Sequence, residues 1–341
     1  MTAAAEPGPA AAPASAPAAL PGAAPAPEAW TGQRERSNLA TLRLMRWIAT
    51  TLGRPVARQV LWPIALYFLC FGGAAARASR DYLARVLGRP PTWVERYRHI
   101  HHFAATVLDR VYFLQGHLRG IDVALRGGDD FDEALLDGQG MLLIGAHMGS
   151  FEALRAIGHQ RSGLKVAMVM YEDNARRINE TLQALVPNGG LHVIGLGRLE
   201  AMLQLRQWLD DGGVAGMLAD RTLPGASARS HLHRLPFLGR PAAFSDGPFR
   251  LAALLRRRVM FMSGLYHGGG RYELRFVPLA DFRQRGAGPA AQDAAVQAAL
   301  QHYVALLEGL CRESPYNWFN FFDFWAAAEE VPQVAPPPAA P

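Results

Sequence analysis

The chain has 341 residues, half of them hydrophobic, which is enough to bury the core of one large domain or of two small ones. Its formal net charge of +6 favours anionic partners such as phospholipid headgroups, phosphates, acidic carrier proteins or nucleic acid. Nucleic acid is disfavoured because the chain lacks zinc-finger, RNP and helix-turn-helix signatures. Cys70 and Cys311 have no CxxC partner, which argues against a disulfide framework or a structural zinc site and favours a reducing, cytoplasmic setting.

The two ends of the chain are low-complexity sequence. Residues 1–35 and 329–341 are rich in alanine and proline, which cannot pack a core, so both are predicted to be disordered tails. The first of them also lacks the basic n-region and the continuous apolar h-region of a signal peptide.

Residues 36–118 are basic and apolar, and we interpret them as a helical region that associates with a membrane. The stretch between Arg58 and Arg77 is uncharged but near the lower length limit for a membrane span, and a proline and two glycines interrupt it. Three interpretations stay open: a transmembrane helix, a helix in the membrane interface with Trp62 and Tyr67 at headgroup level, or a buried helix of a soluble domain.

The stretch PPTWVERYRHIHHFAATVLDRVYFLQG begins with a proline pair and then shows the periodicity of a helix. It carries His99, His101 and His102, which point in different directions because neighbouring residues on a helix are about 100° apart. A metal site made of these three histidines is therefore improbable, and a polar face or a basic contact with phosphate is favoured instead.

Residues 119–328 are predicted to form an α/β domain with a mostly parallel central sheet flanked by helices, onto which the helices from residue 90 pack. Short apolar runs alternate here with helical stretches, the pattern that predicts a parallel sheet. The expected strands are IDVALRG, MLLIGA, LKVAMVM, LHVIGL and GVAGMLAD, and the expected helices between them are GSFEALRAIGHQ, NARRINETLQAL and RLEAMLQLRQWLDDG. The runs RRVMFMSGLYHGG and RYELRFVPL are two late strands that could form an antiparallel hairpin, and AAQDAAVQAALQHYVALLEGLCRESP is a closing helix.

His147 directly follows the strand MLLIGA, at the strand end where open α/β sheets bind ligands. Glu152 lies five residues further on, and on a continuous helix the two side chains would diverge by about 140°. They can meet only if Gly149 and Ser150 bend the chain, and Ser150 could also cap the helix that follows. A histidine and a glutamate in contact would form a general base and its orienting carboxylate. From spacing alone, a loop histidine with a solvent-facing glutamate is an equal alternative.

The motif HMGSFE resembles the H-x4-E signature of the lysophospholipid acyltransferase superfamily. The glutamate in place of aspartate, the preceding LLIGAH and the following helix resemble the lipid A biosynthesis (lauroyl/myristoyl) acyltransferase branch. Three further blocks resemble that branch in the right order, MVMYEDNARRIN, GRLEAMLQLRQWLDDGGVAGMLADRT and RLPFLGRPAAFSDGPFRLAALLRRRV, and the likeness runs from about residue 40 to residue 325. Glu172, which follows Tyr171, departs from the family pattern.

The resemblance implies an enzyme that moves a fatty acyl chain from an acyl carrier protein or coenzyme A thioester to a hydroxyl of a lipid or glycolipid acceptor. It implies His147 as the base, Glu152 as its orienter, and backbone N–H groups after Gly149 as donors to the oxyanion. It implies no metal or redox cofactor, and a place at the cytoplasmic face of a bacterial inner membrane.

Other residues are candidates for substrate binding. Arg176, Arg177 and Arg198 lie at or beyond strand ends, where they could bind the phosphate of a glycolipid, a carrier or coenzyme A, or be ordinary surface arginines. Asp220 and Arg221 end the strand GVAGMLAD and could hold the acceptor or brace other arginines. Pro236 and Phe237 are expected in a loop near the acceptor and acyl chain, or in a packed hydrophobic loop.

The densest aromatic stretch, PYNWFNFFDFW at residues 315–325, could line an acyl groove, sit at a membrane interface or cover the sheet edge, and the last is favoured. The sequence of this stretch departs from that of the lipid A enzymes. A lysophospholipid, aminolipid or lipid-linked pigment acyltransferase is therefore an alternative, as are a thioester hydrolase and a non-catalytic membrane-binding scaffold.

Overall fold

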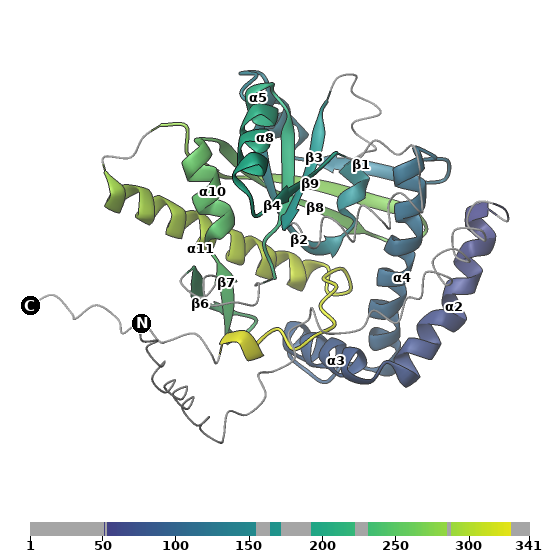
Figure 1. The fold of residues 1–341 in the computed structure, drawn as a ribbon. Helices are drawn as coiled ribbons and strands as arrows, with labels where there is room; N and C mark the ends of the chain where they lie inside the picture. Colours follow the sequence, from purple (N-terminus) through teal and green to yellow (C-terminus); the bar gives the residue numbers. More distant parts are fainter. Residues whose placement is uncertain are drawn as a thin grey trace, which may run out of the picture. The chain divides into compact units, whose positions relative to one another are not determined.

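The computed structural model describes residues 51, 53–154, 164–171, 192–221, 231–284 and 288–328. All of them belong to one compact unit, which runs from Ser37 to Pro341 (Figure 1). Several expectations fall outside these residues: both tails, the helix NARRINETLQAL with Arg176 and Arg177, and most of the helix GSFEALRAIGHQ.

A seven-stranded sheet forms the centre of this unit. Its strand order is β1 (Asp122–Arg126), β9 (Arg271–Asp281), β8 (Arg258–Tyr266), β2 (Met141–Gly149), β5 (Val214–Leu218), β3 (Val166–Tyr171) and β4 (His192–Leu196). Neighbouring strands are parallel except β8 and β9, which form an antiparallel hairpin. The structure thus confirms the mostly parallel α/β sheet and the late hairpin.

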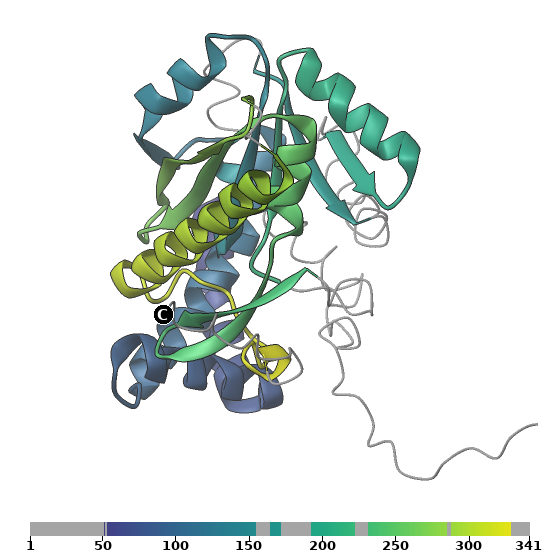
Figure 2. The same ribbon diagram turned by 90° about the vertical axis from the view of Figure 1, so that its left-hand side faces the viewer.

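Helices cover both faces of the sheet, and β2 shows why its sequence is apolar throughout. Leu142 and Ile144 point into one core, together with α8 (Leu199–Asp210), α10 (Gly247–Leu255) and α11 (Pro289–Glu313). Met141 and Leu143 point into the other core, with α2, α4 and α5 (Gly128–Leu135). Because side chains alternate between faces, a strand covered on both sides needs an unbroken apolar run. Figure 2 shows α11 lying across its face of the sheet.

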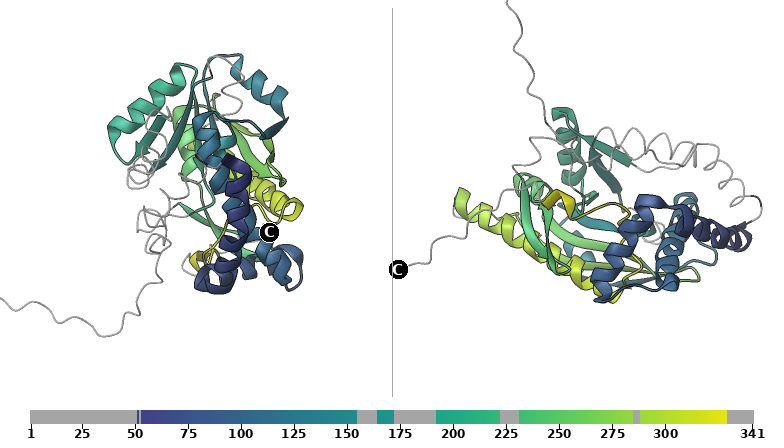
Figure 3. Two further views of the ribbon diagram at one scale, coloured as in Figure 1. Left: turned by 90° about the vertical axis from the view of Figure 1, so that its right-hand side faces the viewer. Right: turned by 90° about the horizontal axis from the view of Figure 1, so that it is seen from below.

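The N-terminal helices are α2 (Gly53–Phe71), α3 (Gly73–Leu87) and α4 (Trp93–Gln115). Helix α4 begins with a capping box, in which Glu95 N donates to the Thr92 hydroxyl and Thr92 N donates to the Glu95 carboxylate. Helices α2 and α4 lie side by side (Figures 1 and 3). Within the part of the chain that the structure describes, no single helix is long and apolar enough to cross a bilayer. Helices α2 and α3 would qualify only as a pair, and they meet at a 92° bend.

A buried carboxylate fastens α2 to α4. Arg54 contacts both oxygens of Asp109 at 2.7 and 2.8 Å, and Tyr272 of β9 donates its hydroxyl at 2.9 Å. Arg58 also pairs with Asp109, at 3.4 Å. Several apolar residues of α2 are nevertheless exposed: Trp62, Leu66, Tyr67, Phe68 and Phe71 are all more than two-fifths accessible, although Trp62 also stacks on Tyr97 of α4.

His99 is buried, which corrects the expectation of a polar histidine face. Its Nε2 donates to the carbonyl of Trp318 at 2.8 Å, so Nδ1 is the unprotonated nitrogen that accepts from the Ser79 hydroxyl at 2.8 Å. Burial lowers the pKa of His99 to about 4. This histidine therefore joins α3 and α4 to the C-terminal aromatic segment and does not face phosphate.

Pro236 and Phe237 lie in a strand where a loop was expected. A separate two-stranded sheet pairs β6 (Leu232–Phe237) with β7 (Arg240–Ser245). Its two-residue turn, Leu238 and Gly239, has positive φ at both positions, 50° and 81°, as in a type I′ hairpin. Leucine is an unusual residue at such a φ, so the turn carries little sequence signal.

Candidate active site

His147 lies at the carboxyl end of β2, in the interior of the sheet between β8 and β5. The aromatic segment 315–325 fastens this end of the strand. Met148 forms a bridge with Trp318, Gly149 N donates to the carbonyl of Asn317 at 2.8 Å, and Phe319 N donates to the carbonyl of His147 at 2.8 Å. The segment thus pairs with the carboxyl end of β2, a central strand, whereas the favoured interpretation placed it at the sheet edge.

Asp220, which follows β5, is the carboxylate that contacts His147. Its Oδ1 lies 2.8 Å from His147 Nδ1, and its Oδ2 accepts the backbone N–H of His147 at 3.0 Å. The indole N–H of Trp318 donates to the same Oδ2 at 2.9 Å. Asp220 is buried, and although burial opposes ionisation, the contacts with His147, Arg221 and Trp318 hold its pKa at about 2.

This arrangement leaves His147 with the properties of a general base. A carboxylate can only accept, so Nδ1 carries the proton and Nε2 has the free lone pair. The imidazole keeps 31% of its surface exposed. Burial lowers its pKa below the ordinary value, Asp220 raises it, and the charges of Arg221 and Arg110 lower it further. The net lowering keeps the ring neutral, and therefore able to take a proton, at neutral pH.

Glu152 is not the partner of His147 in this structure. Its Oε1 lies 2.7 Å from Nε of Arg110 on α4, and its Oε2 accepts from the Ser150 hydroxyl at 3.1 Å. The orienting position expected for Glu152 is filled by Asp220. The reason is local: β2 ends at Gly149, where the backbone has a positive φ, and the short 310 helix η3 (Phe151–Ala153) then places the glutamate beside α4.

Gly149 and Ser150 serve the backbone and not the oxyanion. Gly149 has a φ of +65°, and a Cβ there would lie 1.8 Å from the carbonyl oxygen of Gly264, so only glycine fits. Its N–H donates to Asn317, and the N–H of Ser150 donates to Gly264 at 2.8 Å. Both donors are occupied, so the N–H of Ser150 is not available to an oxyanion, while the expected donors at the start of the following helix stay a prediction. Ser150 makes no side-chain cap, and its hydroxyl donates to Glu152.

The other candidate residues are spread over the site and its surroundings. Arg221 directly follows Asp220, and its guanidinium lies over the ring of Phe322 at 5.4 Å. Arg198 is exposed at the start of α8, after β4, and is three strands from β2, roughly 14 Å. Phe237 is fully buried against Trp318, while Pro236 beside it is exposed. The site therefore brings together His147, Asp220 and Arg221, with Phe237 behind them.

Sequence reasoning missed two residues here. Trp318 was noticed only as one of many aromatic residues, and Arg110 was taken as part of an ordinary helix. Both reach the site from elements that are distant in the chain, so no local spacing could have marked them.

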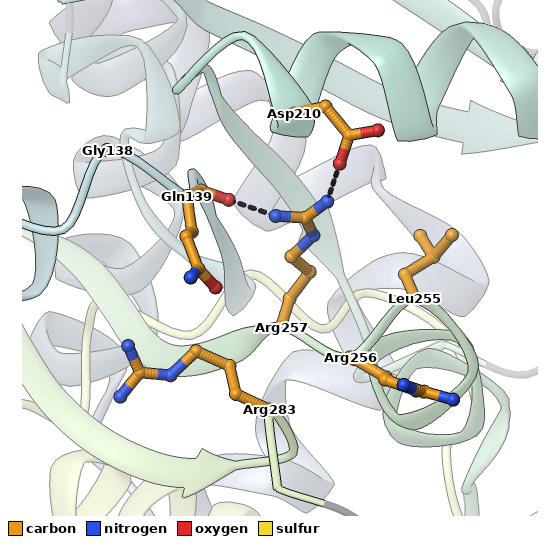
Figure 4. A pocket seen from close by; sticks show the side chains of 7 residues that line it. All are labelled: Gly138, Gln139, Asp210, Leu255, Arg256, Arg257 and Arg283. Atoms are coloured by element: carbon orange, nitrogen blue, oxygen red, sulfur yellow. Dashed lines mark hydrogen bonds and ion pairs between the residues drawn. The ribbon is translucent and has the colours of Figure 1, made fainter.

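A cavity of about 370 Å³ lies at the opposite, amino-terminal edge of the sheet (Figure 4). It is lined by Gly138, Gln139, Asp210, Leu255, Arg256, Arg257 and Arg283. The buried Arg257 donates to the carbonyl of Gln139 and pairs with Asp210, which joins the starts of β2, β5 and β8. The length of β2 separates this cavity from His147 by roughly 20 Å. We therefore interpret the residues around this cavity as structural, because they hold the starts of the strands together.

Comparison with known proteins identifies the family. A family model described as bacterial lipid A biosynthesis acyltransferase matches residues 39–326, which include β2, Asp220 and the aromatic segment. No curated protein sequence matches the chain. The family match confirms the resemblance drawn from HMGSFE and the blocks that follow it, and it implies an acyltransferase. Because the match covers most of the sequence, the chain belongs to the bacterial lipid A biosynthesis acyltransferase family.

Proposed function

We propose that this protein transfers a fatty acyl chain from an acyl carrier protein or coenzyme A thioester to a hydroxyl of a lipid A-type glycolipid. The observation that carries the proposal is the contact between His147 and Asp220 at the carboxyl end of β2. It supplies a neutral imidazole with its free nitrogen available to a substrate, which is what activation of a hydroxyl requires.

In the proposed reaction, Nε2 of His147 takes the proton of the acceptor hydroxyl as its oxygen attacks the thioester carbonyl. The resulting imidazolium is stabilised by the ionised Asp220 at Nδ1. The tetrahedral intermediate then collapses, the carbon–sulfur bond breaks, and the departing thiolate takes the proton back from Nε2. The thioester brings the activated acyl group, so the step calls for no metal or redox cofactor.

We also propose that α2 lies in the interface of the inner membrane, on its cytoplasmic face. Arg54 and Arg58 bind one side of α2 to the buried Asp109, which supports a helix that stays on the domain and does not leave it to span the bilayer. The helix also presents exposed apolar residues, among them Trp62 and Tyr67, which are residue types that favour the headgroup region.

The test compares lipids from a deletion strain complemented with wild type or with His147→Ala, by mass spectrometry. We expect one acylated lipid to disappear in the deletion and to return only with wild type. The mass of that lipid identifies its acceptor, and so distinguishes a lipid A-type product from a phospholipid, aminolipid or pigment. Full restoration by His147→Ala would refute the mechanism, and release of free fatty acid without an acylated product would indicate a thioester hydrolase.

A further inference from the structure

Glu152 and Arg110 form an ion pair whose two sides differ in exposure. The carboxylate is 7% exposed and the arginine side chain 46% exposed, at a separation of 2.7 Å. The Ser150 hydroxyl occupies the second oxygen of Glu152. A buried carboxylate held from two directions is a rigid anchor, while its partner extends from α4 into solvent.

The pair engages Nε of Arg110, and the guanidinium carries four further N–H donors on its two terminal nitrogens. A guanidinium fixed at Nε points this pair of nitrogens in a definite direction. That geometry suits an anion with two or more oxygens, such as a phosphate.

Arg110 lies in the electrostatic surroundings of the proposed base. Its charge and that of Arg221 both lower the pKa of His147. The two arginines come from different elements, Arg110 from α4 and Arg221 from the segment after β5, so two parts of the fold supply positive charge to the surroundings of the imidazole. An anionic group of a substrate would be stabilised there.

We propose that Arg110 binds a phosphate group of a substrate beside His147, and that Glu152 is a positioning residue which holds the guanidinium in place. This inference rests on the proposed acyl transfer. Either substrate could bring the phosphate, since the phosphopantetheine arm of carrier protein and coenzyme A contains one and many lipid headgroups do. The glutamate of the H-x4-E motif would then serve substrate binding, and Asp220 would serve the base.

The experiment measures turnover by purified full-length protein with two donors, lauroyl-CoA and S-lauroyl-N-acetylcysteamine, of which only the first carries phosphate. The acceptor is a lipid extract of the deletion strain, used before and after enzymatic removal of phosphate monoesters. Arg110→Gln should raise KM by about 10- to 100-fold with phosphate-bearing substrates, as expected for a lost charge-assisted hydrogen bond.

The pattern of losses identifies the source of the phosphate. A loss with lauroyl-CoA but not with the cysteamine thioester assigns Arg110 to the donor. A loss with both donors that vanishes for the dephosphorylated extract assigns it to the acceptor. An equal loss with every combination, or no loss at all, overturns the inference.

Two variants sharpen the result. Arg126→Gln is the matched control. Arg126 lies on β1, at the edge of the sheet, and is also an exposed arginine paired with a largely buried carboxylate, that of Glu273 on β9. This substitution should leave every KM unchanged. Glu152→Gln should reproduce the substrate dependence of Arg110→Gln with an unchanged pH profile. If it instead lowers kcat with all substrates and shifts the pH profile, Glu152 acts on His147 and the inference fails. Activity of His147→Ala would refute the proposed function separately.

Discussion

At the residue scale, one carboxylate organises the candidate site. Asp220 accepts from the imidazole, from the backbone N–H of His147 and from the indole of Trp318. These contacts determine both the tautomer of His147 and the direction of its free nitrogen. A base held in this way needs no reorganisation when it takes the proton of the acceptor.

Asp220→Asn should lower kcat/KM by about 10²- to 10⁴-fold, because an amide can donate to Nδ1 and so favour the wrong tautomer. The pH profile of activity shows in which direction the pKa of His147 changes. Activity requires neutral His147, so it is lost as pH falls through a pKa that already lies below the ordinary value of 6.5. Asp220 raises that pKa, so its removal should move the acid limb of the profile to still lower pH. An acid limb that moves upward would contradict this assignment.

Trp318→Phe should lower kcat about 10-fold while leaving KM nearly unchanged, since it removes the indole donor to Asp220 and keeps most of the ring packing. Trp325→Phe is the control. Trp325 lies in the same aromatic cluster, but its indole donates to the carbonyl of Phe237 at 3.4 Å and not to the site. Steady-state kinetics of the two variants would show equal effects if Trp318 served packing alone.

At the element scale, the docking of α2 depends on Asp109. Asp109→Ala leaves Arg54 and the hydroxyl of Tyr272 without their buried partner, and we expect it to lower the free energy of unfolding by about 3–5 kcal/mol. Asp81→Ala is the control, because the pair of Asp81 with Arg80 is exposed on both sides, and it should change stability by less than about 1 kcal/mol. Urea denaturation measures both.

The exposed apolar residues of α2 are the second feature of this helix that can be tested. Replacing Trp62 and Phe71 together by serine should weaken binding to anionic phospholipid vesicles by at least about 10-fold, since each buried aromatic side chain contributes about 1.5–3 kcal/mol. Replacing Leu136, which directly follows α5, and Leu199 of α8 by serine gives a control that also removes two exposed hydrophobic side chains. Vesicle flotation measures the binding, and an equal loss of vesicle binding in both double variants would refute an interfacial α2.

At the scale of the whole molecule, buried histidines couple stability to pH. Burial lowers the pKa of His99 and of His102 from 6.5 to about 4. The unfolded chain therefore binds protons first, and stability present above pH 6.5 is lost as pH falls toward 4. The fully buried His99 alone accounts for about 3 kcal/mol of this loss.

Denaturation in urea at pH 7, 5.5 and 4.5 measures the effect. We expect His99→Gln to be less stable than wild type at pH 7 but to lose less stability on acidification, because the group at position 99 no longer titrates. Parallel pH dependences for the two proteins would show that His99 is not responsible. Asp220, with its pKa lowered to about 2, contributes stability that is fully present above its ordinary value of 3.8 and is lost only below it, so it does not disturb this range.

The sequence by itself determined the strands of the central sheet, the closing helix and the position of His147. Continuous apolar runs such as that of β2 and the 3.6-residue period of α4 are local signals. A strand buried on both faces needs apolar residues throughout, and a helix buried along one stripe needs them at a regular spacing. The H-x4-E motif is equally local, and it led to the family that residues 39–326 match. The type I′ turn at Leu238 was missed because its positive φ depends on the hairpin and not on the residue.

Only the tertiary structure decided which groups meet at the site. Asp220 contacts His147 across 73 positions of the chain, and Trp318 contacts Asp220 across 98. Five residues of spacing suggested Glu152 as the partner of the base, but a hydrogen bond depends on distance and direction in space. Those were set by the parallel pairing of β2 with β5 and by the segment that closes over both strand ends.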